Sequence, residues 1–316
     1  MKRNISSVAA MAGLMVIAQA IALLMAIPFI EAELQVFEDP EDVATPIWYF
    51  FLIILVTAVI LLMVKLRRRN ILKHVILFAF GLTLFMVFDI LFLLALSQIT
   101  SDIPVISWVS FISALVVAAG LTFLLYRFPE WYVVDFVGVF VAAAVASILG
   151  ISLAILPVFV LLIIMAVYDA ISVYKTKHMI TLADAVTMER LPVLLVVPTR
   201  KGYSFLKQKS LKEQIKKKEK RDAVFMGLGD ISIPAVLAVS AFAFLPGKDG
   251  LFTFSHVLVA IVTLVGCMIG FLILMRFVMK GNPQAGLPLL NGGAIAGYLL
   301  SYLIFFPGDF TFGFVL

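Results

Sequence analysis

The chain has 316 residues, of which 63% are hydrophobic and only 14% are charged, with a formal net charge of +5. These values exclude a water-soluble globular domain, since soluble domains average about 25% charged residues. Thirteen of the 24 lysines and arginines lie between Lys175 and Arg221. Positive charge gathered in one connection between apolar runs indicates membrane orientation, and we expect no nucleic-acid partner.

Nine apolar runs are predicted to be membrane-spanning helices, each of which needs about 20 residues. The first run is too long for the core of a signal peptide, so we expect it to be retained as a helix. Only residues 147–152 separate the fifth run from the sixth. The fold class is therefore an all-α polytopic membrane protein. The predicted spans are 8–30, 47–65, 74–97, 104–126, 132–149, 152–174, 223–246, 255–279 and 286–307.

The distribution of basic residues predicts the orientation of these spans. Lys2 and Arg3 precede the first span, whereas the next connection, 31–42, holds six acidic residues and no Lys or Arg. Basic residues then follow spans two, four, six and eight, and only Lys248 departs from the alternation. This places the N-terminus in the cytoplasm and the C-terminus outside. The chain is thus predicted to be an integral, multi-pass protein, in the cell membrane if it is prokaryotic.

The connection 175–222 is too long to be a simple link and carries structure of its own. It contains a valine-rich run bracketed by Pro192 and Pro198, which is too short to span and is predicted to be a strand. We treat the chain, 1–316, as one membrane domain. Residues 1–151 would hold five scaffold spans, and 152–316 the other four with the basic cytoplasmic loop. The predicted strand is Val193, Leu194, Leu195, Val196 and Val197.

Two aspartates lie inside apolar runs on either side of the basic connection. A carboxylate in hydrocarbon costs about 3 kcal/mol on insertion scales, so such residues usually mark function. At 1.5 Å per residue, Asp169 lies about 9 Å from Lys175, and Asp230 about 13 Å from Arg221. Their spans are adjacent and antiparallel, so the carboxylates are expected to meet at one depth. A carboxylate pair that shares a proton is the catalytic group of an aspartyl protease.

Two other acidic residues lie in or beside spans, at different depths. Asp89 is about 24 Å from Lys73 along its helix, toward the outer half of the membrane. We expect it to be a hydrogen-bonded or water-exposed polar residue. Asp135 lies near the inner interface, where we expect a solvated carboxylate. Neither competes with the pair of Asp169 and Asp230.

Residues next to the pair suggest how a substrate is admitted. Gly227 and Gly229 flank Leu228 just before Asp230, and glycine lets another backbone approach closely. A protease acting on a membrane helix needs such a place, because the peptide bond must be unwound before water attacks it. Tyr168 precedes Asp169 directly and is a candidate for support of its neighbour.

The sequence lacks the residue patterns that other catalytic chemistries require. Cys267 is the single cysteine, and the three histidines, His74, His178 and His256, are far apart in sequence. His-Glu-x-x-His, Gly-x-Ser-x-Gly and Walker A patterns do not occur. We therefore expect no metal ligands and no cofactor.

The pattern resembles the presenilin and signal peptide peptidase family of intramembrane aspartyl proteases. The resemblance rests on Tyr168-Asp169, on Gly227-Leu228-Gly229-Asp230, the family's Gly-x-Gly-Asp motif, and on Pro288, and it covers spans six to nine. The five earlier spans add only topology. Ile231-Ser232-Ile233-Pro234 looks more like the signal peptide peptidase branch, and the compact chain resembles a microbial, archaeal homologue.

One motif departs from the family pattern. The family has Pro-Ala-Leu, whereas this chain has Pro288, Leu289 and Leu290. The resemblance implies that this motif borders the active site. The larger Leu289 puts local packing and inhibitor fit in doubt, but we do not expect it to abolish catalysis.

The resulting prediction is an endopeptidase that hydrolyses peptide bonds within transmembrane helices. One ionised aspartate takes a proton from water, and the other, protonated, donates toward the scissile carbonyl. As a further hypothesis, Val193–Val197 pairs with the unwound substrate as an added strand. The partners are transmembrane-helix substrates and the lipid bilayer, with no obligatory partner subunit. Homo-oligomerisation and cleavage of the 175–222 loop stay open.

Two alternatives use similar residues. A prepilin-type aspartyl peptidase also has a Gly-x-Gly-Asp aspartate but fewer spans. A proton- or ion-coupled transporter or channel would place buried carboxylates along a pathway and show inverted repeats. Here the acidic pair falls in one half of the chain only.

Overall fold

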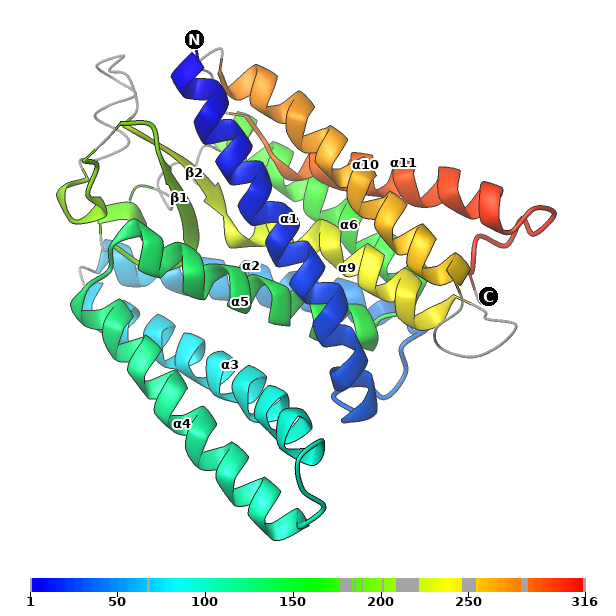
Figure 1. The fold of residues 1–316 in the computed structure, drawn as a ribbon. Helices are drawn as coiled ribbons and strands as arrows, with labels where there is room; N and C mark the ends of the chain where they lie inside the picture. The colour runs from blue at the N-terminus through cyan, green and yellow to red at the C-terminus, as the bar shows by residue number, and fades with distance from the viewer. Residues whose placement is uncertain are drawn as a thin grey trace.

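The computed structural model describes residues 2–66, 69–176, 184, 186–188, 190–200, 202–208, 222–245, 254–279 and 284–314. Within these ranges the chain is mostly helical, with one small sheet (Figure 1). The long helices are α1 (Lys2–Glu31), α2 (Ala44–Lys65), α3 (Arg69–Ser97), α4 (Ile103–Arg127), α5 (Trp131–Ser152), α6 (Ile155–Ala170), α9 (Leu228–Phe244), α10 (Phe254–Val278) and α11 (Leu287–Phe305). Two short elements are the π-helical η1 (Ile171–Thr176) and the 3₁₀ turn η2 (Phe205–Lys207).

Seven helices of the described chain are long and apolar enough to cross a membrane, which confirms an all-α polytopic membrane fold. Helix α9 and the segment Ala44–Ile60 of α2 are shorter apolar helices. The predicted count of nine spans therefore exceeds the number that meets this criterion. Among the residues that the structure describes, hydrophobic length alone supports seven crossings.

The predicted span 223–246 is wrong at its start. Ala223–Gly227 is a strand, β2, and α9 begins only at Leu228. β2 pairs in antiparallel fashion with β1 (Leu194–Pro198), with Leu195 opposite Met226 and Val197 opposite Val224. The strand predicted at 193–197 is thus confirmed, one residue further along. Continuous hydropathy hid its partner, because an apolar strand and an apolar helix give the same signal over five residues.

The fifth and sixth helices divide later than predicted. Both Leu153 and Ala154 have extended backbone angles, so α5 ends at Ser152 and α6 begins at Ile155. Ser152 is therefore the last residue of α5, where its hydroxyl donates to the Ile148 carbonyl at 2.5 Å. A serine that bonds its own helix in this way does not end it.

Helix α5 is the centre of the bundle. In its apolar window 78% of the residues are buried, against 22% in α3 and in α4. Accordingly, α3 and α4 pack mainly on each other and lean away from the other helices as a hairpin (Figure 1). The Ser110 hydroxyl of α4 donates to the Asp89 carboxylate of α3 at 2.9 Å, which confirms the hydrogen-bonded role expected for Asp89.

Serine hydroxyls connect the central helices to one another. Ser147 of α5 donates to the Ala22 carbonyl of α1 at 2.5 Å. Ser232 of α9 donates to the Ala142 carbonyl of α5 at 3.0 Å. Interhelical hydrogen bonds of this kind contribute about 0.6 kcal/mol each on average in a membrane protein. The Ser147 bond joins α5 to α1, and the Ser232 bond holds α9, which carries Asp230, against α5.

Candidate active site

Asp169 lies where α6 changes its hydrogen-bonding pattern. The α-helix ends at Ala170 and continues as the π-helical η1. Such turns often occur at functional sites, where the extra residue per turn changes the direction of side chains. The Asp169 side chain is buried, and its Oδ2 accepts a hydrogen bond from the Leu287 backbone N–H at 3.0 Å. The first predicted aspartate is therefore held by the start of α11.

Asp230 lies in the first turn of α9, three residues after β2 ends. Gly227 closes the strand with an extended backbone, φ −66° and ψ 143°. A Cβ at Gly227 would lie 3.3 Å from Asp230 Oδ2, tighter than most such contacts, so glycine leaves room for the carboxyl group. The unpaired N–H groups of a helix N-terminus also favour a carboxylate there. The strand-to-helix junction thus positions the second aspartate.

The start of α11 contacts the Asp169 carboxyl group and passes close to that of Asp230. A Cβ at Gly286 would lie 3.4 Å from Asp230 Cγ, and the next residue, Leu287, donates to Asp169. Pro288 lies in the first turn of α11, where a proline costs no hydrogen bond. The structure therefore brings Asp169, Asp230 and the proline motif together at one site.

The other predicted support residues have different surroundings. The Tyr168 ring packs edge-on against Phe50 of α2, with ring centroids 5.6 Å apart. Leu228 is buried, and its Cδ2 lies 3.1 Å from the position of a Cβ at Gly138 of α5. Gly229 is exposed, and a Cβ there would meet no atom within 4 Å. Among the Gly-x-Gly-Asp residues, Gly229 therefore offers open space beside the carboxyl group.

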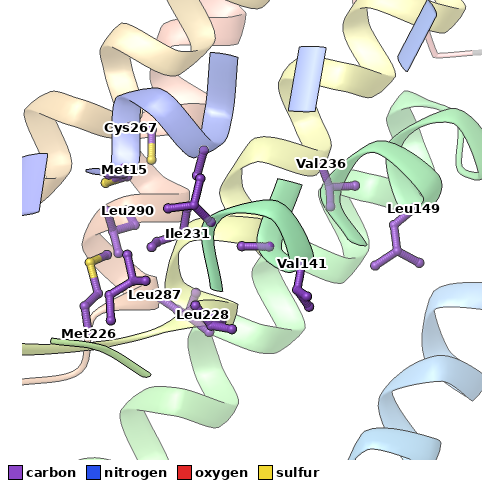
Figure 2. Packing of buried hydrophobic residues seen from close by; sticks show 14 of the residues in the cluster. Met15, Val141, Leu149, Met226, Leu228, Ile231, Val236, Cys267, Leu287 and Leu290 are labelled. Atoms are coloured by element: carbon purple, nitrogen blue, oxygen red, sulfur yellow. The ribbon is translucent and has the colours of Figure 1, made fainter. Parts of the chain in front are cut away.

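The proline motif at the start of α11 packs into a hydrophobic cluster. Leu290 is fully buried, whereas Pro288 and Leu289 are half-buried. Figure 2 shows Leu287 and Leu290 beside Met226 of β2 and Ile231 of α9 in one apolar cluster. The aspartates thus border a hydrophobic core that joins β2, α9 and α11.

Asp135 has a role that depth alone did not reveal. It is buried, with 4% of its surface exposed, and its Oδ1 accepts a hydrogen bond from the Val196 backbone N–H at 2.7 Å. The expectation of a solvated carboxylate at an interface is therefore wrong. Asp135 lies on α5 and joins that helix to the edge of β1 that faces away from β2.

The loop after β1 is fixed to the same end of α5. Glu130 caps α5 and accepts hydrogen bonds from the Ser204 hydroxyl at 2.6 Å and the Phe205 N–H at 3.0 Å. Burial, with the nearby charge of Asp222, raises the pKa of Tyr203, so its hydroxyl stays protonated and donates to Gln208 at 2.8 Å. The sheet beside Asp230 is thus supported by a second set of polar contacts.

Tyr174 also supports the site, although the sequence analysis did not identify it as a candidate. It lies in η1, five residues after Asp169. Its hydroxyl donates to Gln284 Oε1 at 2.8 Å and accepts from the Ala285 N–H at 3.3 Å. It therefore links the end of α6 to the residues just before Gly286. The π-helical turn η1 directs the Tyr174 side chain toward Gln284. The periodicity of an ordinary α-helix does not predict this direction.

Glycines allow α10 and α11 to touch through their backbones. A Cβ at Gly293 would clash with the Gly266 carbonyl oxygen, and one at Gly270 would clash with the Leu289 carbonyl oxygen. Small residues four apart on two helices allow such close approach in membranes. In addition, Asn291 Nδ2 donates to the Leu162 carbonyl of α6 at 2.8 Å. These contacts fix the start of α11 beside both aspartates.

We expect Gly293→Ala to lower the thermal stability of the purified protein, because the new methyl group would overlap the Gly266 backbone. Overpacking typically costs about 1–3 kcal/mol. Gly292→Ala is the matched control, since a Cβ at Gly292 meets no atom within 4 Å. Its melting temperature should stay level or rise slightly, because alanine favours helix more than glycine does. Equal melting temperatures for the two variants would contradict backbone contact between α10 and α11.

No group of three or more His, Cys, Asp or Glu side chains that could hold a metal ion occurs among the residues that the structure describes. The acidic groups near the site are the pair Asp169 and Asp230. The chemistry that this arrangement supports is proton transfer to and from water and a carbonyl group.

Comparison with known proteins identifies the family. The family described as "Signal-peptide peptidase, presenilin aspartyl protease" matches residues 12–306. A solved structure of a presenilin family intramembrane aspartate protease, in a C222 crystal form, is 35% identical, with a TM-score of 0.67 over 94% of this chain and 99% of that chain. A second one, in a P2 form, is 36% identical, with a TM-score of 0.65 over 93% and 97%. A search of curated proteins finds no match.

The matches extend over nearly the whole chain, from α1 to α11. They favour neither a prepilin-type peptidase nor a transporter. The protein is an integral, multi-pass membrane hydrolase whose relatives act on transmembrane substrates in a bilayer. The chain belongs to the signal peptide peptidase and presenilin family of intramembrane aspartyl proteases.

Proposed function

We propose that Asp169 and Asp230 are the catalytic pair of this protease. The observation that carries the proposal is the Gly286–Leu287 backbone, which donates to Asp169 and passes so near Asp230 that a Cβ at Gly286 would lie 3.4 Å from its Cγ. An ionised carboxylate takes a proton from water as the water oxygen bonds to the scissile carbonyl carbon. The second, protonated carboxyl group donates its proton to the carbonyl oxygen. When the tetrahedral intermediate collapses, the C–N bond breaks and the leaving nitrogen takes a proton from the dyad.

Cleavage of a single-span substrate, reconstituted in vesicles with the purified chain, tests this function. Mass spectrometry of the fragments should locate the cuts within the transmembrane stretch of the substrate. Activity of the purified chain would also support our proposal that no partner subunit is obligatory. Fragments cut only outside the transmembrane stretch would contradict intramembrane cleavage.

We also propose that the substrate adds a strand to the sheet of β1 and β2. The sequence predicted that Val193–Val197 would pair with it. However, the Val196 N–H is already donated to Asp135 on the outer edge of β1. The outer edge of β2 is the better partner, because β2 leads directly into Gly227 and Asp230. β1 would then support β2 from behind, and backbone hydrogen bonds would bind the substrate with little demand on its sequence.

Phe225→Pro tests the β2 edge. Phe225 is opposite Val196, whose N–H points away from β2, so this is a non-hydrogen-bonded pair and the Phe225 N–H also faces outward. Proline there removes an outward donor and spares the bonds between β1 and β2. We expect cleavage to fall by about tenfold, near the 1–1.5 kcal/mol of one hydrogen bond. Leu195→Pro, which breaks the β1–β2 ladder, is the comparison for loss of fold, and normal cleavage by Phe225→Pro would exclude pairing at this edge.

We propose that the chain crosses the membrane nine times, with the N-terminus inside. The nine crossings are the seven longer helices and the two shorter ones, α2 and α9. Basic residues that alternate between connections support this arrangement. Residues 1–151 would serve as scaffold, and 152–316 with the 175–222 loop would form the catalytic part. Cysteines introduced at Ser6 and Asp309 test the orientation, since Cys267 is buried. A membrane-impermeant maleimide should label only position 309 in intact cells, and the reverse pattern would overturn the orientation.

A further inference from the structure

A basic cavity lies where the α3–α4 hairpin meets the loop before β1. Its volume is about 420 Å³, and it draws its walls from three segments that are far apart in sequence. α3 and the end of α4 form one side, and Met188, Arg190 and Leu206 form the other. Its polar lining residues include Asn70, Lys73, Tyr126, Arg127 and Arg190.

The three cations of this cavity are each held by a neighbouring group. Lys73 Nζ lies 4.7 Å from the centroid of the Tyr126 ring, a cation–π distance. Arg190 donates to the Leu206 carbonyl at 2.5 Å. The Arg127 guanidinium lies 5.2 Å from the centroid of the ring of the next residue, Phe128. These contacts position the charges without neutralising them.

No carboxylate pairs with these cations in the part of the chain that the structure describes. Glu130, three residues beyond Arg127, is engaged instead by Ser204 and Phe205. The cavity therefore combines three positive charges with no described counterion. Such a cavity between membrane helices favours an anionic headgroup.

A shallow, open apolar groove, lined by side chains of α3 alone, adjoins the basic cavity. Asn70 lines both, and the groove continues along α3 past Ile71, His74 and Val75 to Phe78, with a volume of about 440 Å³. Val75 and Phe78 are 53% and 67% exposed. Since α3 is an apolar spanning helix at the edge of the bundle, this groove faces lipid (Figure 1). A charged cavity next to an apolar groove matches an amphiphile, whereas a soluble anion would use only the cavity.

We propose that this site binds one anionic phospholipid. The phosphate lies against Lys73, Arg127 and Arg190, and an acyl chain follows the groove along α3 from Asn70 to Phe78. The site also joins the α3–α4 hairpin to the sheet, because Arg190 is four residues before β1. Lipid bound there would hold the loop that supports β2.

Lipid binding to the purified protein tests the proposal, with phosphatidylglycerol, phosphatidylcholine and glycerol 3-phosphate as probes and native mass spectrometry as readout. We expect wild type to bind one phosphatidylglycerol about 30-fold more tightly than does the variant Lys73→Gln/Arg127→Gln, since each basic residue contributes about fivefold. Lys175→Gln/Arg276→Gln removes equal charge from other helices and should bind as wild type does.

A second variant tests the groove without changing charge. Val75→Trp fills exposed space on α3 and should weaken phosphatidylglycerol binding, while thermal unfolding confirms that it folds. Equal losses in the two double variants would show diffuse attraction and overturn the site. Full displacement of phosphatidylglycerol by glycerol 3-phosphate, or equal affinity of wild type for phosphatidylcholine, would overturn lipid recognition. These readouts measure binding, so they stand or fall independently of protease activity.

Discussion

Asp169→Asn and Asp230→Asn are each expected to reduce cleavage of a reconstituted single-span substrate by about 10³-fold or more. An amide can neither take a proton from water nor donate one to the carbonyl oxygen as a carboxyl group does. General acid–base catalysis by one group contributes about 10²–10⁴-fold, and this reaction needs both groups. The measurement is the initial rate of fragment release, quantified by mass spectrometry against a labelled standard.

Asp89→Asn is the matched control for these variants. Asp89 is also an aspartate within a spanning helix, and it accepts a hydrogen bond from Ser110, away from the site. Asparagine can accept the same bond, so cleavage should stay near the wild-type rate. If Asp89→Asn lost activity as fully as the other two variants, the loss would report general damage to the membrane fold. If all variants cut alike, the catalytic assignment would be wrong.

Asp135→Leu is expected to lower cleavage by about 10- to 100-fold, although Asp135 is not placed among the reacting groups. Leucine leaves the buried Val196 N–H without its acceptor, which costs about 1–3 kcal/mol. β1 can then shift away from α5, and β2 with Asp230 follows it. The measurement is the rate of cleavage together with the melting temperature of each variant.

Asp135→Asn separates this positioning role from other effects of the carboxylate. Its Oδ1 can accept the Val196 N–H as aspartate does, so most activity should return. Rescue by asparagine but not leucine would support a role through β1. Loss of activity in both variants, with unchanged melting temperatures, would instead indicate that the carboxyl group itself takes part in the reaction.

The sequence predicted that Asp169 and Asp230 would lie near each other, and the structure confirms this proximity, because the position of each residue along its helix was sufficient for that prediction. Asp169 and Asp230 lie on consecutive predicted spans joined by one basic connection, and distance from that connection measured the depth of each aspartate. The same measure failed for Asp135. It gave a depth near the interface, but burial there depends on β1, which packs against α5 from a segment about 60 residues further along. The depth of a residue along its helix does not show which other segment of the chain covers its side chain.

Other features depend on backbone geometry that residue types do not reveal. The apolar run beginning at Ala223 reads equally well as strand or helix, so β2 was absorbed into a predicted span. Tyr174 reaches Gln284 because η1 is π-helical, and the residues of that turn carry no signal for it. By contrast, the valine run before Pro198 was found, since prolines and β-branched residues point to a short strand.

The backbone contacts between α10 and α11 limit how the site can open. Helices that meet through side chains can slide when those side chains change rotamer. Here carbonyl oxygens of one helix lie against glycines of the other, at Gly266, Gly270 and Gly293, so the two helices cannot shift past each other without separating. Helices α10 and α11 therefore move as one rigid unit. Any movement that admits an unwound peptide must carry Leu287, at the start of α11, together with α10.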